Sequence, residues 1–180
     1  MWYYTGMLFQ RKSVPLGAPN FLSIFEGVEG GFAIFAGIVL GLSFGHAGRN
    51  VLIVTAIISI VVNAINSSVV RFSSEHYIDE LDGRENHNWI RSYLFPAAVE
   101  FVVYMIVSVV SLLPLLLIDD LWTAVISMCA VTVVILFAAG FYRGRLLLRR
   151  GLKDGVEMVL GGLAIMLAGL GAGWALTTMF

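Results

Sequence analysis

Apolar residues in this chain gather into five long runs that are separated by short polar stretches. Each run is long enough to cross the roughly 30 Å hydrocarbon layer of a bilayer, which takes about 20 helical residues. The pattern therefore predicts an all-α integral membrane protein with five transmembrane helices. The predicted spans cover approximately 21–44, 51–70, 94–117, 121–142 and 156–177.

The connections between the runs predict how the helices are joined. The stretches 46–50 and 118–120 are so short that the helices on either side of each must be antiparallel neighbours. The second run has no stop signal at its end. Its helical pattern continues past Arg71 to about Leu81, where an Asp-Gly pair is expected to end it.

The distribution of basic residues predicts the orientation. The chain has 11 Lys and Arg residues, and with five spans all but Arg49 fall on the same side. Because cytosolic loops carry the Lys and Arg excess, we expect a cytosolic N-terminus and an extracytosolic C-terminus. The transmembrane domain then covers 21–180 with a short cytosolic loop over 73–93, and an interfacial segment rich in aromatic residues covers 1–20.

Composition agrees with lipid as the main solvent of the chain. Hydrophobic residues make up 59% and charged residues 13%, and the mean hydropathy is +0.90, against about 45–50% and 25% in soluble domains. The net charge is −1 without an extended basic face, which excludes a nucleic-acid partner. No Walker loop, HExxH motif or Ser-His-Asp set is present, so we expect no enzyme and no resident cofactor.

Small residues share one face of the first run and recur at four-residue spacing in the last run, which lets helix backbones approach closely. This spacing predicts tight helix packing, either within one chain or across a dimer. The residues are Gly30, Ala33, Gly37 and Gly41 in the first run, and Ala164, Ala168, Ala172, Gly169 and Gly173 in the last.

Charged side chains inside the spans are the strongest candidates for function. Glu26 and Glu29 lie on one face of the first helix, and Glu100 lies in the third. An ionised group at mid-bilayer costs about 2.5–3.5 kcal/mol on insertion scales, so these acids should not face lipid. One polar face of the second helix is available to meet them, and Arg71 and Ser74 follow it towards the cytosol. The face carries Ser59, Asn63, Asn66 and Ser67.

Two interpretations of these charges stay open from spacing alone. In the first, Glu26, Glu29 and Glu100 form a cation or proton site with Asn63, Asn66 and Ser67, and Glu26 and Glu29 are the metal ligands. In the second, Arg71 pairs with one carboxylate and acts as a structural counter-charge or gate. The cytosolic extension of the second helix carries Glu75, His76, Asp79 and Glu80, which either collect cations or form an ordinary solvated face.

Several stretches resemble the vacuolar iron transporter (VIT) family over roughly 23–173. The first helix reads EGVEGGFAIFAG at 26–37, similar to the family's Asp-Gly pair followed by Phe-Ala and Ala-Gly. The stretches 63–74, 111–114 (SLLP) and 136–162 resemble, in order, the family's later helices.

The resemblance implies a homodimeric transporter that moves Fe²⁺ or Mn²⁺ out of the cytosol as a proton antiporter. It would lie in the cell membrane of a prokaryote, or in a vacuolar or other organelle membrane of a eukaryote. Glu26 takes the place of the family's helix-one acid. Ser67 stands where a methionine is expected and Arg71 where an acid is expected, and the family's metal-binding hairpin is missing from 73–93. Transport is the preferred interpretation, and the alternative that these departures raise is a non-transporting scaffold or partner subunit whose cavity Arg71 closes.

Overall fold

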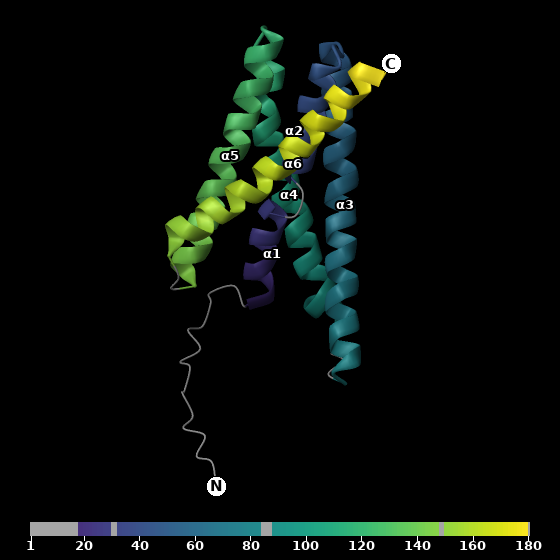
Figure 1. Ribbon diagram of the computed structural model, residues 1–180. Helices are drawn as coiled ribbons and strands as arrows, with labels where there is room; N and C mark the ends of the chain where they lie inside the picture. The colour runs from purple at the N-terminus through teal and green to yellow at the C-terminus, as the bar shows by residue number, and fades with distance from the viewer. Residues whose placement is uncertain (1–17, 30–31, 84–87, 148–149, 180) are drawn as a thin grey trace.

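The computed structural model describes residues 18–29, 32–83, 88–147 and 150–179, without the side chains of 18–21 and 29. The described residues are helical apart from short connections (Figure 1). The interfacial segment expected over 1–20 lies outside them except for its last three residues, which begin the first helix. The helices are α1 (Ala18–Glu29), α2 (Phe32–Phe44), α3 (Arg49–Leu81), the π-helical turn η1 (Ile90–Leu94), α4 (Phe95–Leu117), α5 (Leu121–Leu146) and α6 (Gly151–Met179).

Within the described part of the chain, five helical stretches are long and apolar enough to cross a membrane, so the prediction of five transmembrane helices is confirmed. The first of them, Leu22–Phe44, combines α1 and α2. Helix α3 continues to Leu81, as its pattern predicts, and helical structure resumes before α4. The cytosolic connection expected over 73–93 therefore includes the last residues of α3 and most of η1, which lie beyond the apolar runs.

Helix α6 crosses α2 in direct backbone contact, running diagonally across the bundle in Figure 1. A methyl group at Gly169 would overlap the backbone of Gly37, and one at Gly173 would overlap the backbone of Gly41. The glycine spacing thus packs two helices of one chain. The three alanines expected in the same role on α6 are exposed instead.

Helices α3 and α4 turn different kinds of residue toward the bundle. The buried residues of α3 that precede Arg71 in the sequence are apolar and recur every four positions, from Leu52 to Ala64. Helix α4 buries a polar face that consists of Glu100, Tyr104, Ser108 and Ser111. Its Ser111 hydroxyl lies 2.5 Å from the hydroxyl of Thr132 on α5. Polar groups of α4 are therefore held inside the bundle rather than against lipid.

Two polar contacts fix the end of the bundle that carries the short connections. Arg49, at the start of α3, donates to the carbonyl of Leu115 at 2.8 Å and to that of Asp119 at 3.2 Å. A cation at this place satisfies the free carbonyl groups at the end of α4. Asp120 caps α5 by accepting from the Thr123 backbone N–H at 2.8 Å.

Candidate ion pocket

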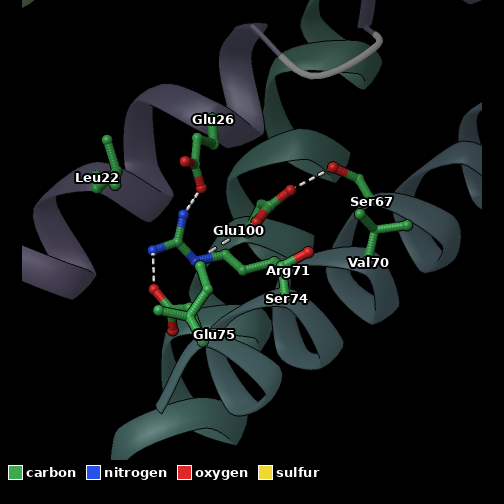
Figure 2. Close-up of a pocket in the computed structure, with 9 residues that line it drawn as sticks. Leu22, Glu26, Ser67, Val70, Arg71, Ser74, Glu75 and Glu100 are labelled. Carbon is green, nitrogen blue, oxygen red and sulfur yellow. Dashed lines mark hydrogen bonds and ion pairs between the residues drawn. The ribbon is translucent and has the colours of Figure 1, made fainter. Parts of the chain in front are cut away.

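A pocket of about 450 Å³ lies between α1, α3 and α4. Its wall combines apolar side chains with a cluster of charged side chains that point toward one another (Figure 2). Three helices supply the charges, since Glu26 comes from α1, Arg71 and Glu75 from α3, and Glu100 from α4. The lining residues are Leu22, Glu26, Ser67, Val70, Arg71, Ser74, Glu75, Ile78 and Glu100.

The guanidinium of Arg71 lies at the centre of this group and contacts all three carboxylates. Its Nη1 forms an ion pair with Glu26, and its Nη2 donates to Oε1 of Glu75 at 2.6 Å. Its Nε lies 3.8 Å from Oε2 of Glu100. The Arg71 side chain is only 5% exposed. Figure 2 shows the fork of the guanidinium spread between Glu26 and Glu75, with Glu100 on its third side.

The carboxylates differ in their access to the pocket mouth. The Glu26 side chain is 40% exposed, whereas that of Glu100 is 3% exposed. Glu100 accepts a short hydrogen bond from the Ser67 hydroxyl through Oε1. Its Oε2 is buried and accepts no hydrogen bond. Glu100 is therefore the inner acid of the pocket and Glu26 the outer one.

The charges of the cluster do not cancel. Three carboxylates face one guanidinium, so a single positive charge cannot neutralise the group when all the acids are ionised. Carboxylate oxygens in such a cluster are the groups that a cation in the pocket would meet.

The remaining residues of the predicted site lie elsewhere or are not described. Asn66 is exposed and Asn63 half-buried, and neither lines the pocket, because the inward stripe of α3 passes through Ala64, Ser67 and Arg71 instead. The side chain of Glu29 lies outside the described residues. The proposed pairing of Glu26 and Glu29 on a metal ion thus stays a prediction.

The four polar residues on the extension of α3 do not converge. Glu75 binds Arg71, and Asp79 accepts from the Tyr93 hydroxyl at 2.9 Å. The His76 ring packs edge-on against the ring of Tyr93, and Glu80 is exposed. Among the described residues, no group of three or more His, Cys, Asp or Glu side chains is arranged to hold a metal ion.

The role of Glu75 as a partner of Arg71 is the main feature that the sequence-based site lacked. The signal was present, because residues four apart on a helix are neighbours and an Arg–Glu pair at this spacing is favourable. The apolar wall of Leu22, Val70 and Ile78 had no sequence signal beyond its hydrophobicity.

The five helical stretches of the described residues that can cross a membrane define a multi-pass integral membrane protein, and three of them line the charged pocket. A model of the VIT family matches residues 70–174, more than half of the chain, and the chain therefore belongs to the VIT family. This is a family of membrane metal-ion transporters and not a class of enzymes. The match includes Arg71, Glu75 and Glu100, whereas Glu26 lies outside it. No curated protein matches the chain.

Proposed function

We propose that this protein moves divalent metal ions, Fe²⁺ or Mn²⁺, out of the cytosol in exchange for protons. The observation that carries the proposal is an open pocket in a VIT-family chain, with three carboxylates on three different helices. Carboxylate and hydroxyl oxygens suit such ions. Fe²⁺ and Mn²⁺ are the substrates that the family resemblance implies.

Glu26 and Glu100 have separate tasks in this proposal. Glu26 is the first acid that a cation meets, because it is the more exposed of the two. Glu100 and the Ser67 hydroxyl offer oxygen ligands further inside. Each carboxylate that releases a cation can take up a proton in its place, which couples metal movement to proton movement.

The functional unit in this proposal is a homodimer. The pocket is open on one side of the single chain, and the exposed alanines at 164, 168 and 172 leave α6 with a flat face. Small residues of this kind allow close helix contacts between two copies. The dimer would lie in the cell membrane of a prokaryote, or in a vacuolar or other organelle membrane of a eukaryote.

Metal flux into proteoliposomes tests the proposal. Wild-type protein is expected to take up Mn²⁺ and Fe²⁺ along an imposed pH gradient, and Glu26→Gln is expected to lose most of this uptake. Glu157→Gln is the matched control, since Glu157 is an exposed acid on α6 and does not line the pocket. Uptake that is unchanged in Glu26→Gln would refute the site, and uptake lost equally in the control would show a general effect of charge.

One observation favours a second candidate, a non-transporting VIT-fold scaffold or partner subunit. Arg71 occupies the space between Glu26 and Glu100 and ties α1, α3 and α4 together. In such a protein the ion pairs serve stability alone. Wild-type liposomes would then move neither metal under any gradient, while Glu26→Gln would lower the melting temperature, because it removes one charged partner of the buried Arg71 guanidinium.

A further inference from the structure

The position of the Arg71 guanidinium is that of a cation bound by carboxylates. It contacts Glu26, Glu75 and Glu100 at once, and 95% of its side chain is covered in a pocket that still opens to the outside. A free cation that used Glu26 and Glu100 would need the space that the guanidinium fills. Two positive charges in that space would also repel each other.

We infer that the Arg71 guanidinium competes with the transported cation for Glu26 and Glu100. Because Arg71 is part of the chain, it acts as a tethered competitor, and its guanidinium must leave these two carboxylates before a divalent ion can bind there. The inference rests on the proposed function in taking these carboxylates as the cation ligands. It adds that cation affinity is set by a residue that is itself no ligand. In this respect Arg71 determines specificity, because a cation binds only if its interaction with the carboxylates is strong enough to displace the guanidinium.

Glu75 provides the place to which Arg71 withdraws. It lies four residues further along the same helix and accepts from the Arg71 Nη2 at 2.6 Å. This contact is internal to α3 and does not depend on α1 or α4. The guanidinium can therefore give up Glu26 and Glu100 while it keeps one carboxylate partner, so its positive charge is never left alone in the pocket.

The size of the effect follows from the charges. A unit charge and a divalent ion about 4 Å apart repel each other, even with full aqueous screening, enough to weaken binding about thirtyfold. Removal of the Arg71 charge is therefore expected to lower the Mn²⁺ concentration for half-saturation by at least that factor. It also releases two carboxylates that the guanidinium now occupies.

Mn²⁺ binding by the purified full-length chain tests the inference. Arg71→Gln removes the charge but keeps a hydrogen-bond donor for the carboxylates. The half-saturation concentration is followed through the free Mn²⁺ signal in electron paramagnetic resonance and through the rise in melting temperature with Mn²⁺. We expect Arg71→Gln to bind at least about thirtyfold more tightly than wild type, and Glu26→Gln/Arg71→Gln to lose this gain.

Controls separate the tethered charge from general effects. Arg145→Gln removes an equal charge from an exposed residue, which lies over the Phe141 ring on α5 and outside the pocket, and is expected to leave Mn²⁺ binding at the wild-type level. If Arg71→Gln does not fold, Arg71→Lys carries the test. A single ammonium cannot contact three carboxylates as the guanidinium fork does, so a several-fold gain in affinity is expected.

The outcomes distinguish this inference from the proposed function. Unchanged Mn²⁺ affinity in the folded Arg71 variant, or a gain that persists without Glu26, would overturn the competitor role. A wild-type protein that moves no metal in liposomes, combined with tight Glu26-dependent binding in Arg71→Gln, would uphold the competitor role and reject transport. Transport by wild type together with unchanged Mn²⁺ binding in Arg71→Gln would uphold transport and reject the competitor role.

Discussion

The close crossing of α2 and α6 predicts that a methyl group at the crossing point lowers stability. Two nearby glycines of α6, one at the crossing and one away from it, allow a matched comparison. Gly169→Ala places a methyl group against the carbonyl oxygen, carbonyl carbon and Cα of Gly37. These are backbone atoms on both sides, so no flexible side chain can move aside and the helices must separate. Overpacking of this kind costs about 1–3 kcal/mol. Gly171→Ala is the matched control, because a methyl group there meets no atom within 4 Å.

The comparison of the two variants isolates the packing term. Both substitutions on α6 gain the same helix propensity, about 1 kcal/mol, so this contribution cancels in the difference between them. At about 2–4 °C per kcal/mol, Gly169→Ala is expected to melt about 2–12 °C below Gly171→Ala. The assay is thermal unfolding in detergent, followed by tryptophan fluorescence. Equal melting temperatures would refute the close crossing of α2 and α6.

Two further predictions concern the end of the bundle with the short connections. Arg49→Gln removes the charged donor to the Leu115 and Asp119 carbonyls and is expected to cost about 1 kcal/mol of stability. Thermal unfolding should show this loss as a fall of about 2–4 °C in melting temperature. An unchanged melting temperature would contradict the role of Arg49 at the end of α4. Hydrogen bonds from the Thr123 side chain and backbone hold the pKa of Asp120 below its ordinary value, so the stability from this cap is present above about pH 3.9 and is lost as the pH falls through the lower folded-state pKa. The melting-temperature advantage of wild type over Asp120→Asn should therefore shrink between pH 6 and pH 3, and a constant advantage would contradict the assignment.

The number of spans and the extent of α3 followed from the sequence because lipid imposes strict demands on length and polarity. A spanning helix needs about 20 apolar residues, and each such run stands out against its polar neighbours. The buried polar face of α4 was also visible as a spacing, since Glu100, Tyr104 and Ser108 fall one turn apart. Patterns of this kind depend on one helix and its solvent only.

Contacts between helices were much harder to predict. Periodicity shows that Gly169 and Gly173 share a face, but not that Gly41 lies opposite them. Likewise, the rotation of α3 about its axis decides that Ser67 and not Asn66 meets the pocket. The two asparagines were expected beside Glu26 because they share a polar face. Tertiary packing turned the apolar stripe and Arg71 inward instead.

The Arg71 cluster has a consequence for how the chain enters the bilayer during synthesis. An arginine costs up to about 2.5–3.5 kcal/mol on insertion scales when it lies at the centre of a spanning helix, and Arg71 lies at the end of the apolar run of α3, where an unpaired charge is still unfavourable. Here Glu75 follows one turn later on the same helix, and α1 with Glu26 has already been made. When α3 inserts, Glu75 and Glu26 are therefore already present to pair with Arg71, whereas Glu100 is added only with α4. The order of the acids along the chain thus lets α3 insert before its last partner exists, and α4 completes the assembly.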